Sequence, residues 1–281
     1  MLFFSLLCLC ILPALATSRA APASWPDVED SYYVQRLGEG DVSAYKPYTY
    51  YASAAYCPPA QINKWNCGAN CRAIGHFEPT GTGGDGKNSL YWFVGYDSKL
   101  NMIILSRQGS FNPGGINEWF VMCCNDNMII SKSVASDHPH DLGVHTGFAD
   151  YQEKTANEYP TQRVMVVGHS MGAAVALIDA LYLKEAIPNL NVLYTGYGLP
   201  RVGNNMFAQW VQSKVSIKHI NNKKDPVPIT PPISGSYYYA HPEGEIHIGR
   251  RGTWYACWGQ DNPDKRCSRG AVISTPTARL A

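Results

Sequence analysis

Hydrophobic residues occur along the chain in short runs that are separated by glycine, proline and polar residues. The β-branched and aromatic runs predict strands at 91–96, 102–106, 164–167, 192–197, 218–222 and 245–248. Segments with helical spacing predict helices at 48–56, at 149–159, after residue 172 and at 204–211. Because strands and helices alternate, the pattern favours the α/β class, with a mainly parallel central sheet and helices on both faces. Residues 21–47 and 81–86 are expected to form a wrapping segment and a flexible turn.

The most informative run is RVMVVGHSMGAAVALIDALYL, at residues 163–183. A short strand meets the pentapeptide GHSMG and an alanine-rich helix follows, which is the pattern of a nucleophile elbow around Ser170. The two glycines let the strand and helix pass close to a serine held in a strained turn. The backbone N–H of Met171, at the start of the helix, is then a donor to an oxyanion. A buried strand–helix junction is the alternative, but the flanking strand and helix favour the nucleophile.

A serine nucleophile needs a base, and the base needs an orienting acid. In this type of fold the acid follows the serine along the chain and comes after a strand. Asp225 follows the predicted strand 218–222 and precedes Pro226, so it is the candidate acid, although acidic residues at strand ends are also common turn formers. Asp179 lies within the helix that follows Ser170 and should face elsewhere.

The base is not evident from the sequence. Of the eight histidines, only His241 and His247 follow Asp225. His169 lies beside Ser170 and is expected to point away from the position that a base requires.

Composition and charge restrict the partners. The chain has 281 residues and a formal net charge of +1, without a basic or acidic block, so a nucleic-acid partner is not expected. The length suits one α/β domain over residues 21–281. The sequence has no cluster with metal-ligand spacing and no cofactor loop, so neither a metal nor a cofactor is expected.

The first sixteen residues, MLFFSLLCLCILPALA, form an apolar run that ends in small residues, as in a secretory signal peptide. We assign residues 1–20 to this signal, with cleavage between Ala16 and Ala23. A membrane anchor is the alternative, but the run is too short to span a bilayer well. The protein is therefore predicted to be secreted, without a stable membrane span.

Seven cysteines remain when this signal is removed. In an oxidising compartment, Cys67 with Cys71 and Cys257 with Cys267 are candidates for local disulfides. The other three are Cys57, Cys123 and Cys124, and the sequence assigns them no partner.

The segment FNPGGINEWFVMCCNDNMIISKSVASD, at residues 111–137, has only weak periodicity. Its apolar residues, among them Trp119 and Phe120, suit a mobile lid and an ordinary surface helix equally well.

Taken together, the motifs resemble the class 3 family of secreted fungal lipases, which have the α/β-hydrolase fold. The resemblance covers most of the chain in order, and its motifs are at residues 56–57, 65–71, 109–110, 144–148, 168–172, 198–203, 225–228 and 241–248. It implies Ser170 as nucleophile, Asp225 as orienting acid, and an oxyanion hole formed by Ser110 (hydroxyl and N–H) with the Met171 N–H. It implies acylglycerol substrates at an oil–water interface, with feruloyl or other carboxylic esters as the alternative. It also supports both local disulfides, and it makes His145 and His241 structural or cleft-lining residues.

The sequence departs from the family in two places. Residues 111–137 do not match the family's lid. Relatives place the catalytic histidine shortly after the position of Cys267, whereas residues 268–281 contain no histidine. Three hypotheses follow: a secreted serine esterase, a lipase-fold protein that binds lipid without turnover, and a gene product with an altered C-terminus. The departure matters because a serine without its base loses most of its activation.

Overall fold

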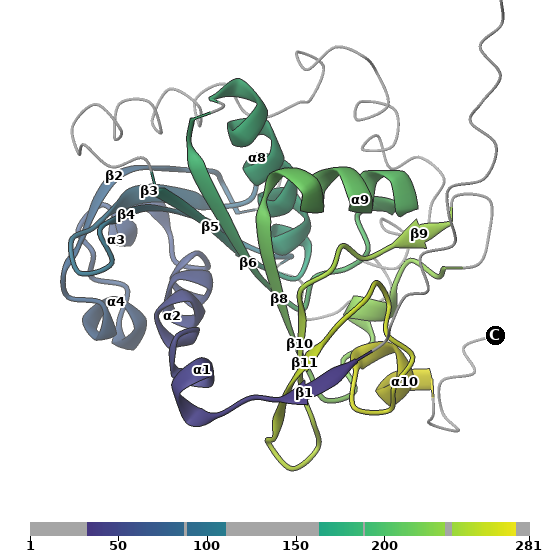
Figure 1. Cartoon of the computed structure of the whole chain (residues 1–281). Helices are drawn as coiled ribbons and strands as arrows, with labels where there is room; N and C mark the ends of the chain where they lie inside the picture. Colours follow the sequence, from purple (N-terminus) through teal and green to yellow (C-terminus); the bar gives the residue numbers. More distant parts are fainter. Residues whose placement is uncertain (1–32, 87–88, 111–162, 188, 234–237, 274–281) are drawn as a thin grey trace, which may run out of the picture. The chain divides into compact units, whose positions relative to one another are not determined.

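The computed structural model describes residues 33–86, 89–110, 163–187, 189–233 and 238–273 (Figure 1). All of these lie within the unit Ser31–Ala281. Four of the expectations above lie outside the described residues: the signal at 1–20, the segment 111–137 with its two cysteines, His145, and the helix at 149–159.

Within the described residues, the strands form a large sheet and a small one, with helices on both faces of the large sheet (Figure 1). The large sheet contains β1 (Val34–Arg36), β2 (Phe77–Gly83), β3 (Trp92–Asp97), β4 (Met102–Arg107), β5 (Arg163–His169), β6 (Asn191–Tyr197), β8 (Ser216–Asn222), β10 (Glu245–Ile248) and β11 (Trp254–Cys257). The small sheet pairs β7 (Gly203–Asn204) with β9 (Tyr239–Ala240). The helices are α1 (Glu39–Ser43), α2 (Lys46–Ala54), α3 (Pro59–Ile62), α4 (Ala69–Ala73), α8 (Met171–Ala186), α9 (Asn205–Lys214), α10 (Ser268–Ile273) and the 3-10 helix η2 (Val227–Ile229).

The strand order of the large sheet is β1-β11-β10-β8-β6-β5-β4-β3-β2. Neighbouring strands from β4 through β5, β6 and β8 to β10 pair in parallel. Antiparallel strands extend this centre at both edges, with β3 and β2 on one side and β11 and β1 on the other. The predicted parallel centre is therefore confirmed, and the edges make the whole sheet mixed. Because the central strands are parallel, their carboxyl ends meet at one edge of the sheet, where ligand sites form in open α/β sheets.

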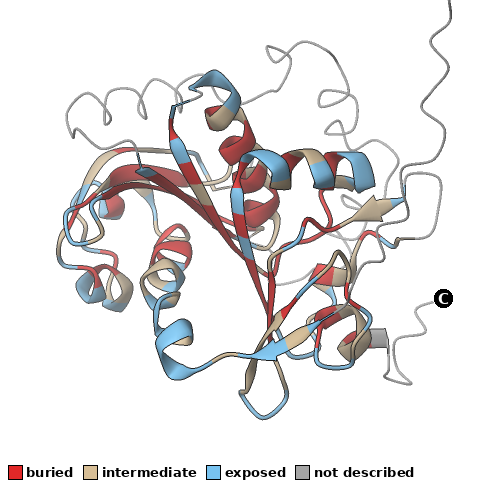
Figure 2. Ribbon diagram, viewed as in Figure 1, coloured by how far each residue is buried: buried red, intermediate tan, exposed pale blue. Residues whose placement is uncertain are grey.

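Both faces of the central strands are buried, which explains their continuous hydrophobic runs. Side chains alternate between the faces: Ile103 and Leu105 of β4 belong to the same core cluster as Leu177 of α8. Met102 and Ile104 belong to the other cluster, which contains residues of α2 such as Tyr51. In Figure 2 the buried surface follows the central strands and the sheet-facing sides of α2 and α8.

The edge strands are where the sequence predictions were wrong. Part of the segment expected to wrap the core is β1, and the expected flexible turn at 81–86 begins within β2. Glycine and proline weaken the strand pattern of β2 (FEPTGTG), whose pairing with β3 is interrupted by a bulge between Pro79 and Gly81. Beyond the predicted strand at 245–248, β11 and α10 complete the C-terminal part of the described chain.

Both expected disulfides are present, with S–S distances of 2.03 Å for Cys67–Cys71 and 2.01 Å for Cys257–Cys267. Among the described residues, Cys57 is the free cysteine. No helix in the described ranges is both long enough and apolar enough to cross a membrane.

A buried ion pair joins the end of β4 to α8. Arg107 donates from Nε to Asp179 Oδ2 at 2.7 Å and from Nη2 to Asp179 Oδ1 at 3.2 Å, and both side chains are less than 5% exposed. Asp179 therefore faces the sheet and not the nucleophile, as expected. The pair fixes α8 against the strand that leads to Ser110.

We predict that Asp179→Asn lowers the free energy of unfolding by about 3–5 kcal/mol, because it leaves the buried Arg107 charge without its counter-ion. The measurement is chemical denaturation of both proteins. The control is Glu185→Gln, which removes an exposed ion pair with Lys214 (3.1 Å) and should cost about 1 kcal/mol or less. Equal losses for the two variants would contradict this account of the buried pair.

Candidate active site

Ser170 lies between β5 and α8 in a backbone conformation that few residues adopt. Its φ is 56° and its ψ is −130°, a strained combination for a residue with a side chain. Its N–H donates to the carbonyl of Tyr197 at the end of β6 (2.8 Å), and its own carbonyl accepts from Ala173 N–H (2.9 Å). The strained turn is thus held from the sheet on one side and from the helix on the other.

The two glycines of the pentapeptide allow this turn. A Cβ on Gly168 would lie 2.7 Å from the backbone nitrogen of Ala173 in α8. A Cβ on Gly172 would lie 2.7 Å from the carbonyl oxygen of Arg107. Both distances are shorter than real Cβ contacts, so the helix can pass close to β4 and β5 only where these side chains are absent. This is the reason the sequence analysis gave for both glycines.

The two candidate oxyanion donors lie beside each other. Ser110 follows β4, and its hydroxyl is 3.7 Å from the sulfur of Met171. Gly109 passes so close to the elbow that a Cβ there would lie 3.2 Å from Ser170 Cβ. Met171 is the first residue of α8, so its N–H has no acceptor within the helix and lies at the positive end of the helix dipole. Ser110, Ser170 and Met171 therefore converge at the carboxyl edge of the sheet.

Asp225, the candidate acid, lies after β8 at the same edge. Its N–H donates to Asn222 O (3.0 Å), and its Oδ1 accepts the N–H of Val227 (2.9 Å). This second bond orients the carboxylate and leaves Oδ2 directed at the neighbouring loop, 3.2 Å from the Cβ position of Gly198. Gly198 itself has φ +57° and follows β6, so the acid reaches the site over a residue that lacks a side chain.

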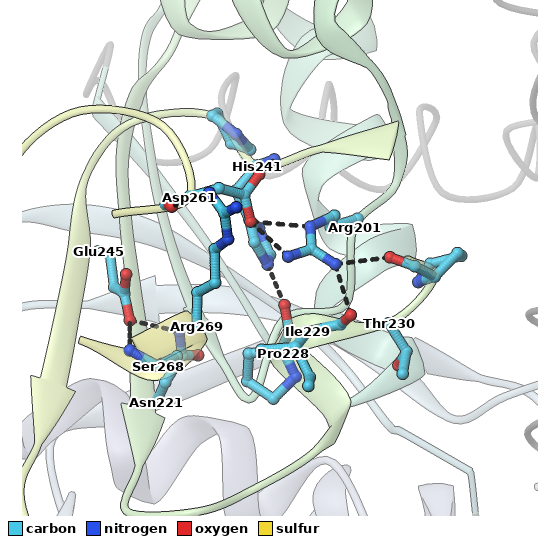
Figure 3. Close-up of polar contacts among 12 residues, drawn as sticks. Arg201, Asn221, Pro228, Ile229, Thr230, His241, Glu245, Asp261, Ser268 and Arg269 are labelled. Atoms are coloured by element: carbon cyan, nitrogen blue, oxygen red, sulfur yellow. Dashed lines mark hydrogen bonds and ion pairs between the residues drawn. The ribbon is translucent and has the colours of Figure 1, made fainter. Parts of the chain in front are cut away.

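A buried polar network holds the loop that follows Asp225 (Figure 3). Arg201 is at its centre. Its guanidinium donates to Asp261 Oδ1 from Nε at 2.8 Å and from Nη2 at 2.5 Å. Its Nη1 donates to the carbonyls of Ile229 and Pro231, the latter at 2.6 Å, and its backbone N–H donates to Thr230 O at 2.8 Å. One buried cation therefore fixes the chain immediately after the candidate acid.

His241 completes this network. Its backbone N–H donates to Asp261 Oδ2 at 2.9 Å, and its ring nitrogen Nε2 donates to the backbone carbonyl of Pro228 at 2.6 Å. Burial by itself favours the neutral form of Asp261, but the nearby His241 and Arg201 hold the pKa of that carboxyl below its ordinary value. Asp261 is therefore ionised, and it holds Arg201 and His241 in the positions from which they bind the loop after Asp225.

His219 stacks on His241, with ring centroids 4.8 Å apart and ring planes 16° apart. Desolvation is the largest of the effects that lower the pKa of each ring from 6.5 to about 4. The charge of His241 also lowers the pKa of His219, and the charge of Arg201 also lowers the pKa of His241. Opposing these, Glu245 raises the pKa of His219 and Asp261 raises that of His241. Both rings are therefore neutral at physiological pH.

These contacts bear on which histidine could serve as a base. His219 Nε2 meets the carbonyl of Pro242 (3.1 Å), and the nitrogens of His247 meet the carbonyls of Arg266 (2.5 Å) and Lys223 (2.7 Å). His241 is engaged by Pro228 as described. Within the described ranges, no imidazole nitrogen lies within hydrogen-bond distance of the Ser170 hydroxyl or the Asp225 carboxylate.

His169, which precedes the nucleophile, points away from it as expected. Its Nδ1 is 2.6 Å from the hydroxyl of Tyr56. The residue is exposed overall, while its Nδ1 is covered by the Tyr56 hydroxyl and its Nε2 lies beside Gly198. Desolvation accordingly lowers the pKa of His169, while the charge of Asp225 acts in the opposite direction.

One group of side chains has the chemistry of metal ligands: Glu245, Cys257 and Cys267 offer ligand atoms within 4.8 Å of one another. The two sulfurs are joined in a disulfide and are not thiolates, which are the form that binds metals. This group therefore does not fit a metal ion.

Comparison with known proteins agrees with this geometry. Residues 106–235, which include Ser110, Ser170 and Asp225, match the family described as lipase (class 3). The chain is 33% identical over 267 residues to the secreted mono- and diacylglycerol lipase 1 of Fusarium solani, and the match covers 85% of this chain and 74% of that protein. This chain belongs to the class 3 lipases. Over a shorter match of 147 residues, covering 47% of this chain and 40% of the relative, it is 35% identical to the lipase of Rhizomucor miehei.

Solved structures show the same fold. The triacylglyceride lipase of Rhizomucor miehei superposes with a TM-score of 0.71 at 24% identity, covering 86% of this chain and 94% of that one. The Lip2 lipase of Yarrowia lipolytica superposes with a TM-score of 0.70 at 21% identity, covering 85% and 92%. The class 3 lipase described here therefore has the α/β-hydrolase fold, which the sequence predicted.

Sequence analysis missed the residues that support the lipase site. It gave no role to Asp261, and it used Arg201 and Tyr56 only as parts of the motifs at 198–203 and 56–57. These partners are far apart in the sequence, 60 residues for Arg201 with Asp261 and 113 for Tyr56 with His169. Of these residues, only His169 and Arg201 lie at or after the carboxyl ends of parallel strands, β5 and β6, whereas Tyr56 follows α2 and Asp261 follows β11. No linear pattern in the sequence brings these pairs together.

We predict that the free energy of unfolding falls as the pH decreases from about 6.5 to about 4. In that window the unfolded chain protonates His219 and His241, whereas the folded protein keeps both neutral. His241→Gln keeps an amide N–H for Pro228 but cannot titrate, so its stability should fall less steeply in this window. Denaturation at a series of pH values measures the slopes. The variant is first compared with the wild type at pH 8, and identical slopes would contradict the role assigned to these rings.

Proposed function

We propose that this class 3 lipase hydrolyses acylglycerols through an acyl-enzyme on Ser170. What supports the proposal is that Ser170, in its strained turn, lies beside Ser110 and Met171, and that Asp225 follows β8 at the same edge of the sheet. A nucleophile, two oxyanion donors and a candidate acid on separate loops are the parts of the acyl-transfer machinery other than the base.

The reaction follows from this arrangement in two steps. Ser170 Oγ attacks the ester carbonyl and gives its proton to a base, a role that no histidine of the described ranges is placed to fill. The charge on the carbonyl oxygen is stabilised by the Ser110 and Met171 donors. Collapse of the tetrahedral intermediate breaks the ester C–O bond, and the glycerol oxygen leaves as an alcohol after taking up the proton. Water then attacks the acyl group, the fatty acid is released and Ser170 regains its proton.

The substrate class is proposed from the relatives. The Fusarium solani protein is named as a mono- and diacylglycerol lipase, and the Rhizomucor miehei structure is that of a triacylglyceride lipase. We assign this chain to acylglycerols as a class. It acts at an oil–water interface without a stable membrane span of its own.

The place of action is proposed on similar grounds. Relatives in Fusarium, Gibberella and Malassezia are named as secreted lipases. The apolar start of this chain has the pattern of a signal peptide, and the two disulfides suit an oxidising compartment. We propose that the protein is exported with residues 1–20 as its signal and acts outside the cell.

We predict that Ser170→Ala abolishes hydrolysis of a short-chain chromogenic ester and of emulsified acylglycerols, with a loss on the order of 10⁴-fold or more in kcat. Asp225→Asn should lower kcat by roughly 10³- to 10⁴-fold, because the base is no longer oriented. Steady-state kinetics on the purified protein measure both effects.

The matched control is Ser43→Ala, which removes an exposed hydroxyl on α1 and should leave kcat unchanged. If the wild type hydrolyses neither substrate, or if Ser170→Ala retains its rate, hydrolysis through Ser170 is refuted. Binding of acylglycerol without turnover by both proteins would instead support a lipid-binding protein with a lipase fold.

A further inference from the structure

A chain of contacts leads from the oxyanion turn to the residue before the nucleophile. The Tyr56 hydroxyl lies against Gly109, the residue before Ser110, so closely that a Cβ on Gly109 would be 2.4 Å from the hydroxyl oxygen. The same hydroxyl is 2.6 Å from His169 Nδ1, and the two rings are 5.8 Å apart. Tyr56 follows α2, so it connects the helix layer to both loops of the site.

The surroundings of the His169 ring decide which of its nitrogens carries the proton. The Tyr56 hydroxyl can donate to a bare Nδ1 or accept from Nδ1–H. Because Nε2 is the nitrogen that lies beside the Gly198 loop with the Asp225 carboxylate, the negative charge favours the proton on Nε2 and leaves Nδ1 to accept from the hydroxyl. A neutral imidazole that accepts at Nδ1 must hold its own proton on Nε2. Because desolvation lowers the pKa of His169, the ring is neutral at the pH at which most esterases act.

The protonated nitrogen faces the acid. Nε2 of His169 and Oδ2 of Asp225 lie 4.0 Å and 3.2 Å from the Cβ position of Gly198, so they approach each other over a residue without a side chain. They form no direct hydrogen bond, but the charge of Asp225 acts on the ring. Nε2 of His169 and Oδ2 of Asp225 therefore both border Gly198, and the charge of Asp225 acts on the ring from that side.

We infer that Tyr56 and His169 are positioning residues that connect the oxyanion turn at Gly109–Ser110 to the acid Asp225. The inference rests on the proposed ester hydrolysis. Tyr56 packs against Gly109 and contacts Nδ1 of His169. The opposite nitrogen of His169 faces the loop that holds Asp225, whose carboxylate is oriented by its Val227 contact. Neither residue touches the substrate. The arrangement couples the two halves of the site on either side of Ser170.

Two substitutions test the two ends of this series of contacts separately. Tyr56→Phe removes the hydroxyl but keeps the ring, and His169→Asn keeps an acceptor near Nδ1 but removes the nitrogen that faces Asp225. Each should lower kcat about tenfold, the effect of one hydrogen bond, and leave KM within about twofold. The double variant should lose less than the product of the two, because both act on one connected chain. Tyr96→Phe is the control. It removes a hydroxyl on β3 that donates a hydrogen bond to Asn101 (2.8 Å), and it should not change kcat.

The tautomer gives a test that needs no activity. In the nitrogen-15 spectrum of histidine-labelled protein at pH 8, with the His169 signals assigned by their loss in His169→Gln, Nε2 should be protonated and Nδ1 should not. Tyr56→Phe should weaken this preference. A proton on Nδ1 in the wild type would overturn the inference, and so would wild-type kcat in both single variants. A Ser170→Ala protein as active as the wild type would refute the proposed hydrolysis, and the spectrum would still decide the inference.

Discussion

The structure depends on how closely α8 approaches β4 and β5. Ser170 can adopt its strained conformation only because the helix begins directly above the sheet, and the helix can begin there only because Gly168 and Gly172 have no side chains. The buried Arg107–Asp179 pair fixes the same contact one strand away. From this approach follow the half-buried nucleophile, the Met171 N–H at the helix start and the nearness of the Ser110 turn. The strain at the nucleophile is thus balanced by packing around it.

The acid is held by a different kind of interaction. Asp225 lies in a loop with little regular structure, and hydrophobic packing alone would leave such a loop loose. Arg201 and His241 donate to its carbonyls instead, and Asp261 neutralises Arg201 (Figure 3). Because Arg201 and His241 are buried, the loop has few alternative positions, and the Asp225 carboxylate keeps its orientation. The site therefore combines a nucleophile positioned by backbone packing with an acid positioned by a polar network.

The sequence predicted the parts of this site that depend on local spacing. The elbow needs five consecutive residues between a strand and a helix, and Asp225 needs only to follow a strand, so both are visible in a linear pattern. Edge strand β2 was missed because its glycines and proline suppress the usual signal. The contacts of Arg201 with Asp261 and of Tyr56 with His169 were missed because the partners are far apart in the sequence. The family resemblance supplied Ser110, which no spacing rule would have identified.

The central claim is that Ser170 is an activated nucleophile facing an oxyanion hole. Covalent labelling with a long-chain alkyl phosphonate ester tests it most directly, because the phosphorus reacts with such a serine to form a stable tetrahedral adduct. Intact-protein mass spectrometry followed by peptide mapping should find one phosphonyl group per chain, on the peptide that contains Ser170. The Ser170→Ala protein should remain unlabelled. An unlabelled wild-type protein, or a label on another residue, would contradict the account.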